Sequence, residues 1–157
     1  GSGFGTGSHP TTQLCLKWIE KNIKPDSTML DYGCGSGILS IAANILGCLK
    51  TTGIDNDKQA LLNAERNMTL NSANVTFFHS ENYNYEEQYD VTVANILLNT
   101  ILQLKEKLIL SLKPGGTLIL SGILEDQASS IIDTFRNEMI ISIIDQNEGW
   151  LLMKGQK

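Results

Sequence analysis

Apolar and polar residues along the chain fall into two repeating patterns, which predict that strands and helices alternate. Short apolar runs bounded by turn residues are typical of buried strands, and longer segments with apolar positions three or four residues apart are typical of helices. The pattern predicts strands at residues 28–33, 49–55, 75–80, 89–97, 117–124, 139–147 and 150–156. It predicts helices at residues 12–22, 37–47, 56–71, 98–112 and 125–138.

The order of these segments predicts the fold class. Strands that alternate with helices form a parallel sheet with helices on both faces. The last two strands are separated only by Glu148 and Gly149, too short for a crossover, so these two strands must be antiparallel. We therefore expect one α/β domain over residues 1–157, with a doubly wound, mostly parallel seven-stranded sheet and an antiparallel closing strand. Residues 113–116 (Lys-Pro-Gly-Gly) are predicted to form a turn.

Composition and charge narrow the function classes. The net charge of −5 argues against a nucleic-acid groove, because phosphate binding needs clustered Lys and Arg, but it leaves a basic protein partner open. No apolar run approaches the ~20 residues of a membrane span. The three cysteines form no CxxC pair, which favours free thiols in a reducing cytoplasm. The two histidines lack the spacing of metal ligands, so no metal site is expected.

The segment Asp-Tyr-Gly-Cys-Gly-Ser-Gly at residues 31–37 joins the first predicted strand to the helix that follows it. This junction is the ligand-binding edge of a doubly wound sheet. Gly33, Gly35 and Gly37 allow a tight turn and a close approach of the backbone to a ligand. The third glycine comes one residue too early for the dinucleotide pattern GxGxxG, and the phosphate-binding pattern GxxxxGKS/T is absent.

Two carboxylates indicate which ligand the glycine loop binds. Asp31 ends the strand before the loop, where its charge would repel a pyrophosphate but suit a ligand with an ammonium and a sulfonium group. Asp55 ends the next strand, 22 residues after Gly33, where a carboxylate can bind both hydroxyls of a ribose. The two acids predict a nucleoside without phosphates, S-adenosylmethionine, with Asn56 in the same site. The alternative interpretation of Asp55 is a solvated loop carboxylate.

Polar residues also follow the third and fourth predicted strands. Ser80, Glu81 or Asn82 is expected to contact the adenine amine, and a plain polar loop is the alternative. Asn95 ends the fourth strand, where several kinds of amine methyltransferase place an Asn or Asp. Its amide oxygen can accept the hydrogens of an acceptor amine and aim the nitrogen lone pair at a methyl group, so Asn95 is the predicted catalytic residue. The alternative is that Asn95 caps the following helix.

The opening segment FGTGSHPTT, together with DYGCGSGILSIAA, GIDND, VANIL, LSGIL and the strand at Trp150, resembles the catalytic domain of PrmA-type methyltransferases, which modify ribosomal protein L11. The resemblance covers essentially the whole chain, and FGTGxHPTT is its narrowest motif. It implies that the opening loop forms a lid over the methionine end of the cofactor, with Thr12 binding the cofactor and Phe4, Thr6 and His9 lining the lid. The other family positions for cofactor binding match Gly33, Asp55 and Asn95.

This resemblance implies a protein N-methyltransferase that uses S-adenosylmethionine and acts on lysine side-chain amines and an α-amine of ribosomal protein L11. Whole family members carry an N-terminal substrate-docking domain before the FGTG loop. Because nothing corresponds to it here, we expect either an excised catalytic domain or a natural short form. Gly1-Ser2, interpreted as a cloning scar, favours excision. The alternatives are a cofactor-binding module without independent catalysis and a nicotinamide-dependent oxidoreductase, against which the early third glycine and Asp31 count.

Overall fold

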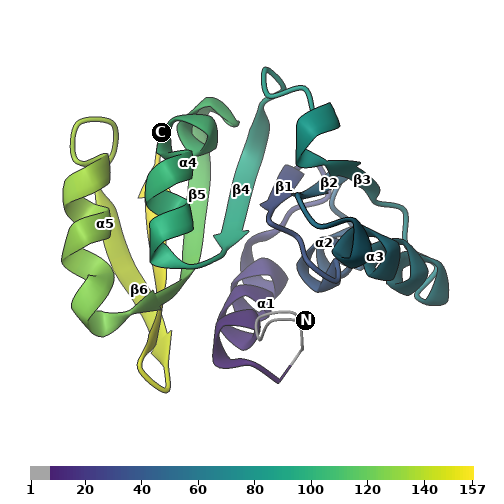
Figure 1. Ribbon diagram of the computed structural model, residues 1–157, viewed down its shortest axis with the longest axis horizontal. Helices are drawn as coiled ribbons and strands as arrows, with labels where there is room; N and C mark the ends of the chain where they lie inside the picture. The colour runs from purple at the N-terminus through teal and green to yellow at the C-terminus, as the bar shows by residue number, and fades with distance from the viewer. Residues whose placement is uncertain (1–7) are drawn as a thin grey trace.

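A seven-stranded sheet runs through the middle of the molecule in the order β3-β2-β1-β4-β5-β7-β6 (Figure 1). The computed structural model describes residues 8–157. Strands β1 to β5 pair in parallel, and β7 lies between β5 and β6, antiparallel to both. The expected doubly wound sheet with an antiparallel closing strand is therefore confirmed. The strands are β1 (Thr28–Tyr32), β2 (Lys50–Asp55), β3 (Thr76–His79), β4 (Tyr89–Asn95), β5 (Leu112–Leu124), β6 (Ile141–Asn147) and β7 (Trp150–Gln156).

The described helices cover both faces of this sheet. Helices α1 and α2 share one apolar core with the sheet, whereas α4 and α5 share a second core on the opposite face. None of these helices is both long and apolar enough to cross a membrane. The helices are α1 (Pro10–Asn22), α2 (Ile38–Ile45), α3 (Lys58–Leu70), α4 (Leu98–Leu110) and α5 (Ala128–Phe135), with the 3-10 turns η2 (Ser80–Asn82) and η3 (Glu125–Gln127).

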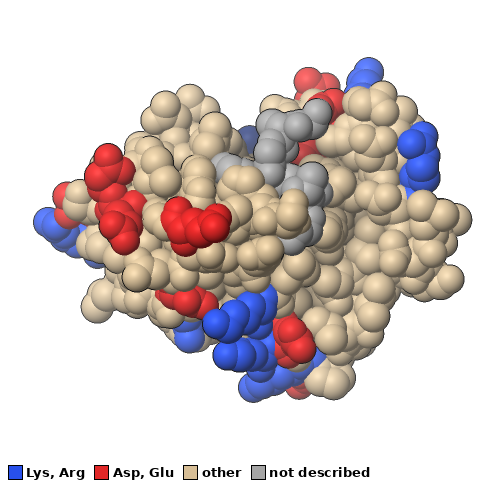
Figure 2. Space-filling view, turned by 90° about the horizontal axis from the view of Figure 1, so that it is seen from below, with Lys and Arg blue, Asp and Glu red and all other residues tan. Residues whose placement is uncertain are grey.

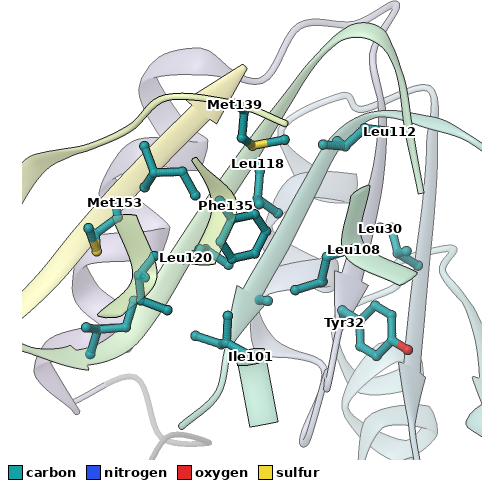
Figure 3. Packing of buried hydrophobic residues seen from close by; sticks show 14 of the residues in the cluster. Leu30, Tyr32, Ile101, Leu108, Leu112, Leu118, Leu120, Phe135, Met139 and Met153 are labelled. Atoms are coloured by element: carbon teal, nitrogen blue, oxygen red, sulfur yellow. The ribbon is translucent and has the colours of Figure 1, made fainter. Parts of the chain in front are cut away.

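The two cores follow from the alternation of side chains along the strands. In β1, Met29 joins the core with α1 and α2, and its neighbour Leu30 joins the core with α4 and α5. Figure 3 shows Phe135 of α5 lying against Leu118 and Leu120 of β5 in the second core. Each fully buried side chain of this size contributes about 1.5–3 kcal/mol relative to exposure. The packing on both faces holds the strand ends, and the residues that follow them, in fixed positions.

Capping side chains determine where helices α1 and α3 begin. The His9 side chain accepts a hydrogen bond from the Thr11 backbone N–H, and Pro10 occupies the first turn, so α1 starts two residues before the predicted boundary. Asp57 caps α3 in the same way, because its Oδ1 accepts from the Gln59 N–H at 2.9 Å. Both caps lie directly before their helices and fix how the chain enters them.

The predicted turn at residues 113–116 is wrong, because β5 runs through this segment. Leu112 already pairs with Tyr89, and the register shifts before Thr117 pairs with Val91. Gly115 takes a left-handed φ of +83° and donates its N–H to the Lys157 carbonyl at 3.0 Å. The segment is therefore an irregular part of the strand that is held by the last residue of the sequence.

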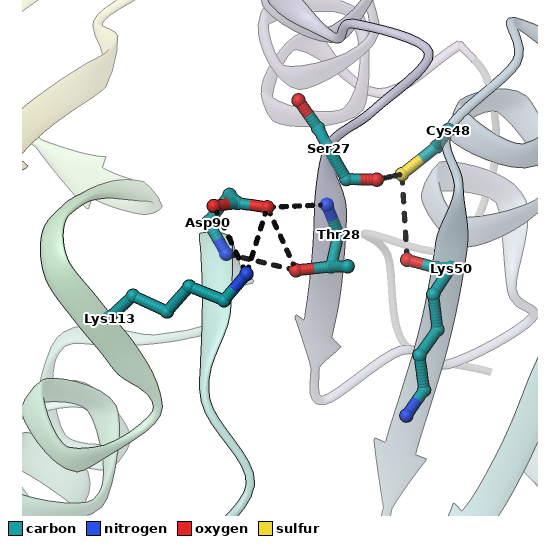
Figure 4. A network of polar contacts seen from close by, with 6 residues as sticks. All are labelled: Ser27, Thr28, Cys48, Lys50, Asp90 and Lys113. Carbon is teal, nitrogen blue, oxygen red and sulfur yellow. Dashed lines mark hydrogen bonds and ion pairs between the residues drawn. The ribbon is translucent and has the colours of Figure 1, made fainter.

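Every strand except β7 begins at one edge of the sheet, and polar contacts join the starts of several strands there (Figure 4). Asp90 Oδ2 accepts hydrogen bonds from the Thr28 backbone N–H at 2.9 Å and from its hydroxyl at 3.1 Å. Lys113 forms an ion pair with the same carboxylate at 3.4 Å. Burial opposes ionisation of Asp90, but these hydrogen bonds and the lysine charge lower its pKa on balance. The network fixes the starts of β1, β4 and β5 and leaves the opposite, carboxyl edge available for function.

Candidate functional site

The carboxyl ends of β1, β2, β3 and β4 meet at one edge of the sheet, where a cavity of about 1120 Å³ opens. Strands β1 and β4 are neighbours, but the chain continues from β1 to α2 on one face and from β4 to α4 on the other. Such a divergence leaves a crevice beyond the strand ends, which is the usual ligand site of an open α/β sheet. The predicted residues that line it are Asp31, Gly33, Gly35, Asp55, Asn56, Ser80 and Asn95.

The three loop glycines have different structural reasons for being glycine. All three take a left-handed φ: +76° at Gly33, +55° at Gly35 and +81° at Gly37. A Cβ on Gly33 would lie 2.7 Å from the Ile96 side chain, whereas a Cβ on Gly35 would meet nothing within 4 Å. A Cβ on Gly37 would lie 2.9 Å from Phe77 Cζ. Gly33 and Gly35 border the cavity, and Gly37 begins α2 where this helix packs closely on the sheet.

Asp55 ends β2 beside the glycine loop and holds the loop in place. Its Oδ2 accepts a hydrogen bond from the Gly35 N–H at 2.8 Å, and its Oδ1 accepts from the Asp57 N–H at 2.9 Å. A carboxylate has about four lone-pair sites, so each oxygen retains the capacity to accept from a ligand hydroxyl. Asp55 is half-buried and borders the cavity, in keeping with its predicted contact to two hydroxyls.

Asp31 is a carboxylate with only 1% of its surface exposed. Burial raises its pKa to about 6, and the nearby charge of Asp55 adds to the rise. The Ser40 hydroxyl donates to Asp31 Oδ2 at 2.6 Å and opposes this shift. A buried carboxylate of this kind is stabilised as an anion by a cationic ligand in the cavity. Ser40 was not predicted, although a single serine within the apolar helix segment 37–47 was a usable signal.

Asn95 is the last residue of β4, borders the cavity and has a side-chain acceptor without a described partner. The residue is 8% exposed, and its amide oxygen Oδ1 is buried without a hydrogen-bond partner among the described residues. The cap of α4 is Leu97, so Asn95 does not cap that helix. Leaving a buried acceptor unsatisfied costs about 1–3 kcal/mol. The structure therefore places at this point a group that a ligand N–H or O–H would complete.

The residues after β3 divide between the cavity and the solvent. Ser80 and Glu81 line the cavity, whereas Asn82 is exposed and does not line it. His79 Nδ1 accepts from the Glu81 N–H at 3.2 Å and thereby caps the short turn that follows β3. Over the described residues, no three His, Cys, Asp or Glu side chains cluster closely enough to hold a metal ion.

The residues assigned to the opening loop occupy other positions. Thr12 is fully buried in the first turns of α1 and, like His9, does not border the described part of the cavity. The His9 ring caps α1 and contacts the edge of the Trp150 ring at a centroid distance of 5.5 Å. Phe4 and Thr6 lie outside the described residues. The lid assignment stays a prediction.

One wall of the cavity was not predicted from the sequence. Helix α4 contributes side chains spaced three and four residues apart, and Tyr85 also borders the cavity. The Lys107 ammonium sits 4.4 Å from the centre of the Tyr85 ring, within the range of a cation–π contact. The same 3–4 spacing in the sequence identifies this helix face, but nothing in the sequence says what it faces. The α4 residues in the wall are Thr100, Gln103, Leu104 and Lys107.

Comparison with known proteins gives consistent matches. The model of the family described as "Ribosomal protein L11 methyltransferase (PrmA)" matches residues 1–157. The curated ribosomal protein L11 methyltransferase of Burkholderia mallei (strain NCTC 10229) is 41% identical over 157 residues, which are all of this chain and 52% of that protein. The chain thus spans about half the length of the curated relatives it matches.

Two solved structures share this fold at different levels of sequence identity. The ribosomal protein L11 methylase of Lactobacillus delbrueckii subsp. bulgaricus has a TM-score of 0.87 and 31% identity, covering 96% of this chain and 81% of that one. The T. Thermophilus 16S rRNA N2 G1207 methyltransferase (RsmC), solved in complex with AdoMet and guanosine, has a TM-score of 0.82 and 19% identity, covering 98% and 45%.

The sheet order, the single antiparallel strand and the glycine loop at the divergence of β1 and β4 define a Rossmann-like fold of the class I methyltransferase type. The family model that matches the whole chain identifies the protein more specifically than this fold class does. The chain belongs to the PrmA family of ribosomal protein L11 methyltransferases.

Proposed function

We propose that this chain is the catalytic domain of an S-adenosylmethionine-dependent protein N-methyltransferase that acts on lysine and α-amino groups of ribosomal protein L11. Membership of the family supports the reaction and the substrate. The observation that carries the proposal is the buried, unpartnered Oδ1 of Asn95, a residue that borders the same cavity as the glycine loop and the two carboxylates.

The residues present fit the proposed cofactor. When bound, S-adenosylmethionine supplies a methyl group made electrophilic by the positive sulfonium. Asp31 would face the cationic methionine end, because its burial leaves the carboxylate short of stabilising donors apart from Ser40. Asp55 has the remaining acceptor sites for a ribose, and Ser80 and Glu81 border the region where the adenine is expected. Thr12, from the family resemblance, and Asn56, which borders the cavity, remain proposed contacts.

Asn95 would orient the acceptor amine. Its Oδ1 accepts a hydrogen from the amine, which turns the nitrogen lone pair toward the reacting carbon. An amide does not take up a proton at neutral pH, so Asn95 is not a general base. A lysine amine has a reference pKa of about 10.4. Burial in the cavity and a neighbouring positive charge would both lower the pKa of the bound amine, and its proton would leave to solvent.

The test combines binding and transfer. Calorimetry with S-adenosylhomocysteine should show binding, and labelled S-adenosylmethionine should transfer its methyl group to ribosomal protein L11. Absence of S-adenosylhomocysteine binding, or binding of NAD in its place, would overturn the proposal. Cofactor binding without any methyl transfer, even in a full-length protein, would favour the alternative function, a cofactor-binding module without catalysis.

Substitution of Asn95 by Ala tests its role in the reaction. We expect a loss of kcat of roughly 100-fold, the scale for removal of one group that stabilises the transition state. The matched control is Asn99→Ala, an exposed asparagine of α4 that does not border the cavity, which should leave kcat unchanged. Wild-type kcat in Asn95→Ala would exclude the orienting mechanism.

A further inference from the structure

The connection from β3 to β4 contains no α-helix, although it crosses two strands of the sheet. In the sheet order, β2 and β1 lie between β3 and β4, so the chain passes over both of them. Parallel strands are usually joined by an α-helix in such a crossover. Here the short turn η2 and residues 83–88 make the crossing. The position of this turn at the cavity therefore depends on individual side-chain contacts.

Tyr85 forms a contact that returns to the start of this turn. Its hydroxyl donates a hydrogen bond to the Ser80 carbonyl at 2.7 Å. Its half-buried ring meets the ring of the buried Tyr83 edge to face at a centroid distance of 5.1 Å, and the ring of Tyr32 lies 6.3 Å away. Aromatic pairs prefer this arrangement and these distances. The ring is therefore held by the core while the hydroxyl holds η2.

Lys107 joins the same ring to helix α4. Its ammonium lies 4.4 Å from the centre of the Tyr85 ring and forms no ion pair with a described Asp or Glu. Figure 2 looks onto the carboxyl edge of the sheet and shows a notch in the upper outline, between the side of α4 and the side of β3 in Figure 1. The contact between Lys107 and Tyr85 therefore ties the segment after β3 to α4.

His79 fixes the beginning of the turn, and two side chains are then left for a ligand. His79 Nδ1 accepts from the Glu81 N–H at 3.2 Å, so the other ring nitrogen, Nε2, carries the hydrogen and donates to the Asn56 carbonyl at 3.1 Å. Tyr85 occupies the Ser80 carbonyl. Within residues 8–157, the Ser80 hydroxyl and the Glu81 carboxylate have no hydrogen-bond partner. Both residues border the cavity, and both groups can accept a hydrogen from an amine.

We infer that Tyr85 is a positioning residue for the base of the cofactor. Its hydroxyl keeps Ser80 and Glu81 at the border of the cavity, where these two residues accept hydrogens from the adenine amine. Tyr85 acts through the turn and not on the reacting atoms. This inference rests on the proposed function and adds a determinant of specificity for adenine. Loss of the Tyr85 hydroxyl should therefore weaken binding of a cofactor with adenine more than binding of one with another base.

The experiment compares two variants that each lose one tyrosine hydroxyl from the same segment. Tyr85→Phe removes the hydrogen bond to Ser80 and keeps the ring. Tyr83→Phe is the matched control, because its hydroxyl donates to Tyr89 at 2.8 Å and Tyr83 does not border the cavity. Calorimetry measures the Kd of S-adenosylhomocysteine and of S-inosylhomocysteine for each protein. The inosine analogue has a carbonyl, which is an acceptor, where adenine has its amine.

The wild type should bind S-adenosylhomocysteine roughly 5- to 150-fold more tightly than the analogue, because a carbonyl leaves the acceptors of the turn unsatisfied. Tyr85→Phe should bind S-adenosylhomocysteine roughly 2- to 10-fold more weakly than the wild type, the scale of one lost hydrogen bond. Its affinity for the analogue should not change, so its preference for adenine falls. Tyr83→Phe should keep the wild-type preference.

An equal loss of affinity for both ligands in Tyr85→Phe would show a general structural effect and would overturn the inference. An unchanged preference in Tyr85→Phe, or the same fall in Tyr83→Phe, would overturn it as well. The wild type separates the two levels of the argument. If it does not bind S-adenosylhomocysteine, the proposed function is contradicted, whereas equal binding of both ligands contradicts only the positioning role of Tyr85.

Discussion

At the scale of single residues, Asp31 shows the conflict between stability and a ligand site. The raised pKa of about 6 means that the folded protein holds a proton more tightly than the unfolded chain, whose value is near 3.8. The stability contributed by this group is present at low pH and is lost as the pH rises through the window between these values. At neutral pH the buried carboxylate is therefore a cost, which a cationic ligand would offset.

The variant Asp31→Asn should relieve this cost, because Asn keeps an acceptor for Ser40 and carries no charge. Relative to wild type, its free energy of unfolding should rise between pH 4 and pH 7 by up to about 3 kcal/mol, from about two pKa units at 1.36 kcal/mol each. Urea unfolding across this range measures the difference. The exposed Asp26→Asn is the matched control and should show no such rise. A pH-independent difference for Asp31→Asn would mean that burial does not shift this carboxyl.

At the scale of elements, the loop between β1 and α2 combines packing with ligand approach. Gly37→Ala puts a Cβ at 2.9 Å from Phe77 in a left-handed conformation, so overpacking and backbone strain together should cost roughly 2–4 kcal/mol. Gly35→Ala bears the backbone strain alone, about 1–2 kcal/mol. Denaturant unfolding separates the two variants. Cofactor affinity should show the reverse order, since Gly35 borders the cavity and Gly37 does not. Equal destabilisation would argue against the packing role of Gly37.

Most helices and strands could be predicted because the residue patterns that determine them lie within the same segment of the sequence. Apolar periodicity located the helices and strands, and the short connection at Glu148-Gly149 determined the antiparallel pair. The turn predicted at 113–116 was wrong because its backbone partner is Lys157, distant in the sequence. In the site, Asp55 and Asn95 were found because they end strands. Ser40 and Lys107 were missed because their partners, Asp31 and Tyr85, come from other elements.

At the scale of the whole molecule, the proposal separates chemistry from substrate docking. The curated relatives are about twice as long as this chain, and the family resemblance assigns docking of the protein substrate to the remaining part. A second contact turns substrate binding into an intramolecular event at a high effective concentration.

Residues 1–157 alone should therefore methylate ribosomal protein L11 with a kcat/KM roughly 100- to 10,000-fold below that of a full-length relative, since linked contacts raise avidity on this scale. Labelled methyl transfer under the same conditions gives the comparison. Affinity for S-adenosylhomocysteine is the internal control and should be similar in both proteins. A matching kcat/KM would show that docking resides within these 157 residues.

The position of β7 has a consequence for synthesis of the chain. This strand follows β6 in the sequence, yet it lies inside the sheet, between β5 and β6. Strands β1 to β5 pair with one another and can assemble while the ribosome is still extending the chain. Among the strands of residues 8–157, β6 pairs only with β7, so it emerges without a partner. Its exposed Ile143 and Ile144 add an apolar surface to an open edge. A chain that stops after Asn147 would keep a five-stranded sheet beside a free, aggregation-prone strand.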